Sequence, residues 1–185
     1  MKTAFLEHPL LYDGTQIQSL WAYRSFGIQG DSIVAFLGGC DIPFEHMVDQ
    51  EDVRGRKRIW SPLMLHFIVE QFDLDLERAV LRQRLLAAQV REEFESVTGR
   101  RLARVGDDLF DGKKKLSISV ATVTPVSSKT HFGINVEKAE GLDVETEGLK
   151  TYGVDARPFG ARVLARFVEE MEGVLDARTR SRGVS

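Results

Sequence analysis

A lysine at the start of a predicted strand is the residue best placed to meet an anionic ligand. Alternating apolar and small residues predict a strand from Leu116 to Thr124, and a β-type run from His131 to Val136 predicts its hairpin partner. The turn pair Asp111-Gly112 precedes the lysine run, so Lys115 lies where the turn meets the strand. An ammonium group there could bind a phosphate or a carboxylate, although lysine runs are also typical of solvated turns and strand edges.

A basic loop upstream could bind the same kind of ligand. Arg54 and Arg56 flank Gly55, and a guanidinium group can hold a phosphate through two parallel hydrogen bonds. The indole of Trp60 could cover a flat ring or close over an acyl group. The same composition is also typical of charged surface linkers, so both interpretations of the loop stay open.

A glycine-containing segment after another predicted strand could bring a ligand close to the backbone. Gly38-Gly39-Cys40-Asp41 is expected to bend, and glycines leave room for a bound group. Cys40 is a candidate nucleophile, but a free cysteine is more often a small buried residue. The carboxylates of Asp49 and Asp52 follow in a predicted polar loop and could bind a cation such as Mg²⁺.

Histidine supplies a candidate base. His131 begins the second strand of the hairpin, close to Gly133 and Asn135, and histidine can exchange a proton near neutral pH. His66 lies in an apolar run and is expected to be a core or rim residue. The sequence lacks GxxxxGK[ST], GxGxxG and GxSxG motifs and any zinc-type spacing of Cys and His, which argues against those enzyme classes.

Two sequence blocks resemble biotin protein ligases. The segment DDLFDGKKKLSISV, followed by HFGINV, is similar to the ligase core, in which an Asn-Asp-Leu turn precedes a Lys-Leu strand and a Gly-Ile-Asn-Val strand follows. VRGRKRIWSP is similar to their arginine- and glycine-rich loop that ends in Trp and Ser-Pro. The chain also resembles a family of small uncharacterised proteins in the superfamily of class II aminoacyl-tRNA synthetases and biotin and lipoate protein ligases.

That resemblance implies a site for a small carboxylate or its acyl-adenylate, with ATP and Mg²⁺ as cofactors. Lys115 would contact the acyl carbonyl or the phosphate, and Asp108 would help to hold the divalent cation. Arg54 and Arg56 would contact the leaving group. The ligand-contacting positions would also include Ser117, Gly133 and Asn135. An acceptor protein and the pairing of subunits into a homodimer are further implications.

Two functions from different classes stay open. The first is a ligase- or acyltransferase-type enzyme that transfers the acyl or adenylyl group. The second is a non-catalytic protein that binds a small anionic metabolite on the same fold. The loop around Gly55 keeps one glycine where the ligases have several, which is consistent with the second function. An RNA-linked relative of the synthetases is disfavoured, because the chain has no broad basic region.

The composition is ordinary for one globular domain. The chain has 185 residues, of which 43% are hydrophobic and 29% are charged. Its 25 basic and 28 acidic side chains give a net charge of −3, which argues against nucleic acid as a partner. One cysteine excludes an internal disulfide, and no apolar run approaches the ~20 residues of a membrane span. We therefore expect a cytoplasmic protein without membrane partners.

The remaining patterns predict helices and strands around the hairpin. Helices are expected at Thr15 to Phe26, Leu76 to Thr98 and Pro158 to Ala177. Strands are expected at Asp31 to Leu37 and at Leu63 to Phe72, the second by analogy with the ligases. These elements predict a single α+β domain over residues 1–177, with a mixed or antiparallel sheet flanked by helices as in biotin and lipoate ligases. Residues 178–185 are expected to form a frayed tail.

Overall fold

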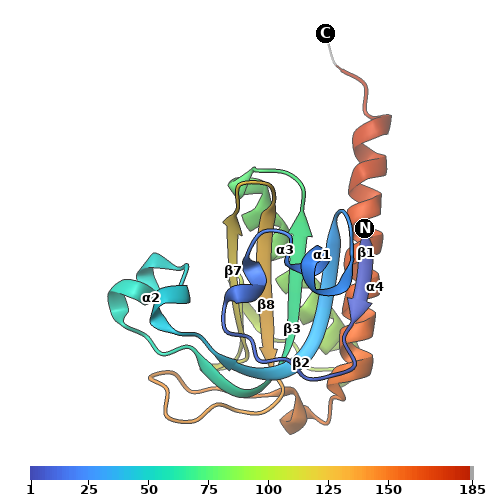
Figure 1. The fold of residues 1–185 in the computed structure, drawn as a ribbon. Coiled ribbons are helices and arrows are strands. Elements are labelled where there is room, and N and C mark those ends of the chain that lie inside the picture. Colours follow the sequence, from blue (N-terminus) through green and yellow to red (C-terminus); the bar gives the residue numbers. More distant parts are fainter. Residues whose placement is uncertain (184–185) are drawn as a thin grey trace.

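A five-stranded sheet runs through the centre of the molecule in the computed structural model, which describes residues 1–183 (Figure 1). In spatial order its strands are β1 (Lys2–Phe5), β2 (Ser32–Asp41), β3 (Trp60–Gln71), β8 (Ser128–Asn135) and β7 (Ser117–Val123). β1 pairs with β2 in parallel, and every other pair is antiparallel. The predicted α+β class, with a mixed sheet flanked by helices, is confirmed.

A small second sheet carries the lysine-rich motif. It contains β4 (Ala103–Val105), β5 (Asp108–Asp111) and β6 (Lys114–Lys115), in that order. The turn at Gly112, which adopts a positive φ of 61°, joins β5 to β6. The predicted turn before Lys115 is therefore correct, but it closes a separate hairpin before the chain enters the large sheet as β7.

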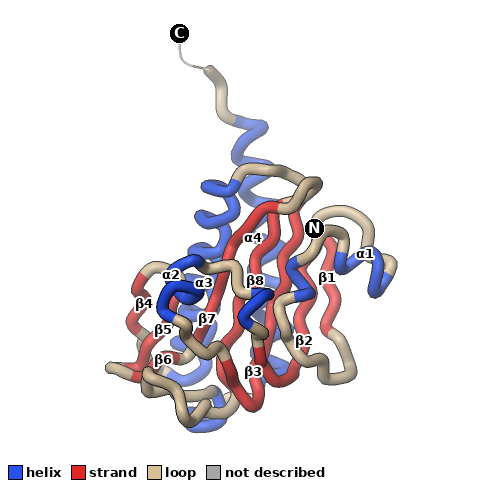
Figure 2. Tube along the Cα trace, turned by 60° about the vertical axis from the view of Figure 1, so that its left-hand side comes forward, coloured by secondary structure: helices blue, strands red, loops and turns tan. Residues whose placement is uncertain are grey.

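Two long helices cover one face of the large sheet (Figure 2). α3 (Leu76–Thr98) has the predicted bounds, because Asp75 caps its start and Gly99, at a φ of 66°, ends it. α4 (Ala156–Arg180) begins two residues before Pro158 and continues into the predicted tail, whose last two residues lie outside the described ones. The apolar stripes of these helices pack on alternate strand residues such as Leu65, Phe67 and Phe132 to form the main core.

The opposite face is covered by the chain's own N-terminal segment. After β1 the chain crosses β2, forms the short helix η1 (Thr15–Ile17) and then α1 (Trp21–Phe26). The single helix predicted over Thr15 to Phe26 is wrong, because Leu20 adopts a left-handed φ of 60° between the two pieces. The N–H of Leu20 donates a hydrogen bond to the Glu70 carboxylate at 2.8 Å, so a contact distant in sequence holds this break.

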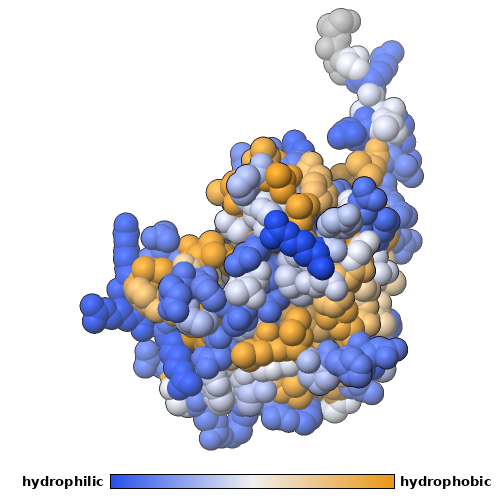
Figure 3. Space-filling model, viewed as in Figure 1, coloured by the Kyte–Doolittle hydropathy of each residue, from blue (hydrophilic) through white to orange (hydrophobic). Residues whose placement is uncertain are grey.

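A second apolar cluster fills the space beneath this segment. Its buried members are Tyr12, Ile17, Phe36, Cys40, Met64 and Ile68. In the view of Figure 1, the molecular surface on this side shows apolar groups between hydrophilic ones (Figure 3). Leu11, Tyr23 and Phe44 are among the large apolar side chains that stay exposed.

Two further predictions need correction at the lower end of the sheet. Gly38-Gly39-Cys40-Asp41 is part of β2 and not a bend, because β3 starts at Trp60 and supplies hydrogen-bonding partners up to Asp41. A register shift between Gly38 and Cys40 is the only irregularity of that pairing. The predicted polar loop contains η2 (Phe44–His46) and α2 (Gln50–Gly55). One further short helix, η3 (Leu149–Tyr152), precedes α4.

Among the described residues, no helix combines the length and the apolar character needed to cross a membrane.

Candidate functional site

The lysine singled out by the sequence forms an ion pair with the aspartate of the same motif. The Nζ of Lys115 lies 2.7 Å from Oδ2 of Asp108, and the two side chains are 25% and 28% exposed. β5 and β6 are adjacent strands, so the hairpin itself sets this distance. The backbone of Lys115 is fixed as well, because its N–H donates to the Glu145 carbonyl and its carbonyl accepts from Glu147. The ammonium group is thus positioned by a rigid frame and still reaches solvent.

Other charges act on this pair. Burial raises the pKa of the Asp108 carboxyl, the Lys115 ammonium opposes that shift, and the carboxylates of Asp107 and Asp52 add to it. Asp52 belongs to α2, so the short helix of the arginine-rich loop lies within electrostatic range of the lysine hairpin. Ser61 of the second block also contacts Asn135, whose side chain donates to the Lys115 carbonyl, so the structure brings the two sequence blocks together at one end of the sheet.

Asn135 and Ser61 lie beneath this pair. The Ser61 hydroxyl donates to Oδ1 of Asn135 at 3.0 Å, and Nδ2 of Asn135 donates to the Lys115 carbonyl at 3.4 Å. Both side chains are buried. Asn135 thus positions the lysine backbone, and Ser61 holds the amide in that orientation. Ser61 was not among the predicted site residues, although its place in the Trp-Ser-Pro motif is the signal that could have identified it.

The arginines of the basic loop are exposed. Arg54 lies in the last turn of α2, Gly55 ends the helix, and Arg56 caps it in a left-handed conformation with φ at 47°. Within residues 1–183, neither Arg54 nor Arg56 forms an ion pair. Trp60 is half-buried, with the Arg58 guanidinium 5.3 Å from its ring. The loop can therefore offer two unpaired guanidinium groups to an anion.

The predicted cation ligands of this loop already have structural roles. Asp49 caps α2 by accepting hydrogen bonds from the N–H groups of Glu51 and Asp52. Asp52 pairs with Lys57 at 2.9 Å. In the part of the chain that the structure describes, no three His, Cys, Asp or Glu side chains are grouped closely enough to hold a metal ion.

His131 lies away from Lys115, in the second apolar cluster. Its ring stacks on Tyr12 with 3.6 Å between centroids, and its Nε2 lies 3.0 Å from Nδ1 of His66. Nε2 of His66 is 3.2 Å from the Gly38 carbonyl, which can only accept, so it carries the proton. Neutral His66 then accepts at Nδ1 from the Nε2–H of His131. Burial lowers the pKa of both rings, that of His66 to about 4.

The glycine-containing segment is occupied by the protein itself. A Cβ at Gly38 would lie 1.9 Å from the Leu10 carbonyl oxygen, so the N-terminal segment takes the space that a ligand was predicted to use. Gly39 lies next to the Leu11 side chain, and the N–H of Asp41 donates to the Tyr12 carbonyl. Burial raises the pKa of Cys40 to about 12, so its sulfur is a thiol at neutral pH.

Ser117 and Gly133 serve the packing around the hairpin. The Ser117 hydroxyl is buried and accepts a hydrogen bond from the N–H of Leu109 at 2.8 Å. A Cβ at Gly133 would lie 2.9 Å from Cε of Met64 and 3.2 Å from the His131 ring. The structure thus groups Lys115, Asp108 and Asn135 and joins them through Ser61 to the arginine-rich block. The segment around Gly38 pairs with this block but is covered by the N-terminal segment, and His131 is enclosed beneath Tyr12.

Residues 1–182 match a family described as a domain of unknown function, DUF366. The chain belongs to this family. An uncharacterized protein of Methanocaldococcus jannaschii is 40% identical over 159 residues, which are 83% of this chain and 72% of that protein. A solved structure of a protein of unknown function from Pyrococcus horikoshi is 41% identical, with a TM-score of 0.95 over 100% of this chain and 99% of that one.

More distant solved structures share the fold. A biotin protein ligase from Aquifex aeolicus in complex with biotin and ATP is 17% identical, with a TM-score of 0.61 over 93% of this chain and 71% of the ligase. A protein of T. acidophilum with bound lipoic acid is 15% identical, with a TM-score of 0.55 over 91% of this chain and 84% of that one. At such identities the likeness establishes a biotin and lipoate ligase-like fold and nothing finer.

Proposed function

We propose that this protein binds a small carboxylic acid or its adenylate at the Lys115 end of the sheet and transfers the acyl or adenylyl group. The observation that carries the proposal is a chain of contacts between two blocks distant in sequence, from Ser61 through Asn135 to the Lys115 carbonyl. Lys115 itself contacts Asp108 at 2.7 Å and is 25% exposed, so its ammonium group is accessible to a ligand. A ligand at this end of the sheet could therefore meet the lysine of the hairpin and the arginines of the loop.

Each charged group has a chemical role in this proposal. The Lys115 ammonium stabilises negative charge on the acyl carbonyl or on the phosphate, and Arg54 and Arg56 hold the leaving phosphates. An anion at Lys115 releases Asp108 from its ion pair. Asp108 could then supply one oxygen ligand to Mg²⁺, whose remaining positions are usually filled by phosphate oxygens and water. The solved ligase with biotin and ATP supports nucleotide as a co-substrate.

A second function, binding without catalysis, is favoured by a specific observation. The loop that would have to wrap a phosphate contains a capped helix, α2, and one glycine, so few backbone N–H groups are free to approach an anion. Cys40 is a buried thiol and His131 is enclosed, so neither of these two candidates is an activated nucleophile beside Lys115. A protein with these features could bind a small anionic metabolite and release it unchanged.

Calorimetric titration with ATP and Mg²⁺ tests the proposal. We expect wild-type protein to bind the nucleotide and Lys115→Ala to lose binding, with little change in thermal stability, since a part-exposed ion pair contributes about 1 kcal/mol or less. Lys113→Ala is the matched control, because Lys113 is exposed in the same turn and forms no ion pair within the described residues.

A second assay separates the two functions. Exchange of labelled pyrophosphate into ATP in the presence of a panel of small carboxylic acids reports adenylate formation. Exchange that depends on Lys115 supports the enzyme, whereas binding of a carboxylate without nucleotide binding or exchange supports the metabolite-binding protein. Equal loss of binding in the Lys113 and Lys115 variants would show that the ligand does not bind specifically at Lys115.

A further inference from the structure

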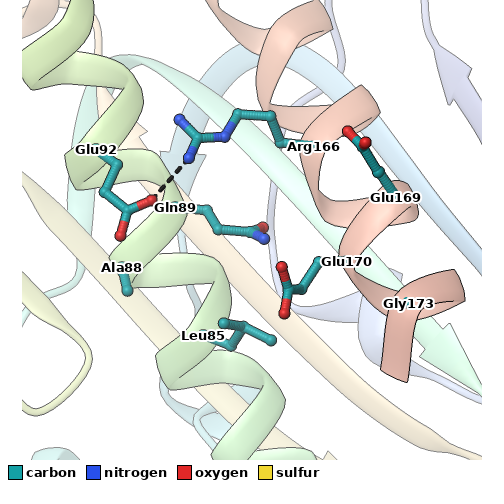
Figure 4. A pocket seen from close by; sticks show the side chains of 8 residues that line it. All are labelled: Leu85, Ala88, Gln89, Glu92, Arg166, Glu169, Glu170 and Gly173. Atoms are coloured by element: carbon teal, nitrogen blue, oxygen red, sulfur yellow. Dashed lines mark hydrogen bonds and ion pairs between the residues drawn. The ribbon is translucent and has the colours of Figure 1, made fainter. Parts of the chain in front are cut away.

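A cleft between the two long helices is separate from the Lys115 site. Its lining comes from α3 and α4 (Figure 4), the two helices that cover the face of the sheet opposite the N-terminal segment. The cleft has a volume of about 370 Å³, which is within the range of small-ligand sites. The lining residues are Leu85, Ala88, Gln89, Glu92, Arg166, Glu169, Glu170 and Gly173.

The charge of the cleft is negative. Three of its side chains are glutamates, and its one cation, Arg166, is already paired. Arg166 contacts Glu92 at 2.7 Å and Glu93 at 3.5 Å. Glu169 and Glu170 form no ion pair with any described residue. A cationic ligand is therefore favoured over an anion or a neutral molecule.

A buried amide marks a specific position inside the cleft. Gln89 is only 5% exposed, and its Oε1 has no hydrogen-bond partner among the described residues. Figure 4 shows the Gln89 side chain extending from α3 towards Glu170 of α4. A buried acceptor without a partner is rare in folded proteins, because losing water without gaining a hydrogen bond is unfavourable. A donor from a ligand would satisfy this oxygen.

The remaining lining is suited to a hydrocarbon chain. Leu85 and Ala88 are half-buried and present apolar surface beside Gln89. Gly173 lies opposite in α4, and a Cβ built there would meet no atom within 4 Å. The missing side chain leaves the α4 wall of the cleft open.

We propose that the α3/α4 cleft binds a primary alkylammonium group carried on a methylene chain. The ammonium donates to Oε1 of Gln89 and is held by the carboxylates of Glu170 and Glu169, while the methylenes lie on Leu85 and Ala88. Such a group occurs in free diamines and polyamines and in the lysine side chain of a protein. The site is independent of the proposed function at Lys115.

Calorimetry of the full-length protein with 1,5-diaminopentane tests the site. Glu170→Gln keeps the shape of the side chain and removes one charge, so we expect binding about tenfold weaker, the usual loss for one charge-assisted hydrogen bond. Glu95→Gln is the matched control, because Glu95 is exposed on α3 outside the cleft and forms no ion pair with the described residues. It should bind the diamine as wild type does.

Gly173→Leu provides a test that does not depend on weakening the fold. Leucine forms helices better than glycine, and a Cβ at this position meets no atom within 4 Å, so the variant should be at least as stable as wild type. Its side chain would enter the open wall of the cleft and should abolish diamine binding. Undiminished binding to this variant would overturn the proposal, as would equal binding of pentan-1-ol, which lacks the ammonium group.

A second probe distinguishes a free polyamine from a protein lysine side chain as the source of the ammonium group. Nα-acetyl-lysine methylamide presents the same ammonium on a peptide-like backbone. Tighter binding of this probe than of the diamine supports a protein side chain as the ligand, and the reverse order supports a free polyamine. Absence of binding by both probes at millimolar concentration would refute the site.

Discussion

Acidification should destabilise this protein through the buried pair of His66 and His131. Burial holds the pKa of His66 at about 4 in the folded protein, against 6.5 for an ordinary histidine. Between these two values the unfolded chain binds a proton that the folded chain does not. The free energy of unfolding therefore falls as the pH falls from about 6.5 towards 4.

The magnitude follows from the same pKa difference. One pKa unit corresponds to about 1.4 kcal/mol, so the His66 ring alone should contribute a loss of about 3 kcal/mol at pH 4 and about 2 kcal/mol at pH 5. His131 shifts in the same direction and adds to the loss. The neighbouring Tyr12 and Cys40 stay neutral across this window, because burial raises the pKa of both groups.

Urea unfolding at pH 7 and pH 5 measures this effect. His66→Gln keeps a donor for the Gly38 carbonyl and does not titrate, so it should lose about 2 kcal/mol less than wild type between the two pH values. His8→Gln changes an exposed histidine and should behave as wild type does. An equal loss in wild type and the His66 variant would refute the assignment of two buried neutral rings.

Two further predictions concern the N-terminal segment and the buried charges beneath it. Lys129→Met leaves the Glu70 carboxylate buried without its partner at 3.1 Å, so urea unfolding at pH 7 should show a loss of stability of about 3–5 kcal/mol. Adding Glu70→Gln should recover much of this loss. Equal stability of the single variant and wild type would contradict the prediction. Gly38→Ala forces Leu10 away from β2, so Cys40 should react faster with a thiol reagent and the fold should lose about 1–3 kcal/mol. An unchanged labelling rate would mean that the segment does not seal this face.

The fit of the N-terminal segment also bears on the size of any ligand at the Lys115 end. Tyr12 lies on the His131 ring, and Leu10 crosses β2 at Gly38. The centre of this sheet face is therefore filled by the protein. A ligand at Lys115 would have to be small, or the segment would have to move to admit a longer acyl chain.

Much of the fold could be predicted from local sequence patterns. α3 has the predicted bounds because its apolar spacing, its capping aspartate and its terminal glycine all act within a few residues. β7 and the turn before Lys115 follow equally local rules of alternation and turn chemistry, whereas β8 begins at Ser128, three residues before the predicted start at His131, because it pairs with β3 as far as Gln71. The contact between Lys115 and Asp108 is local as well, because the two residues lie on adjacent strands of one hairpin.

The tertiary structure alone decided which of these residues meet. Gly38 to Asp41 became a strand because β3 supplies its hydrogen bonds, and Leu20 breaks a helix because Glu70 accepts its N–H. His131 is enclosed, and Lys129 is buried against Glu70, through contacts between elements far apart in sequence. The local sequence determines helix propensity and helix capping, whereas burial, shifted pKa values and the α3/α4 cleft arise only when separate elements pack together.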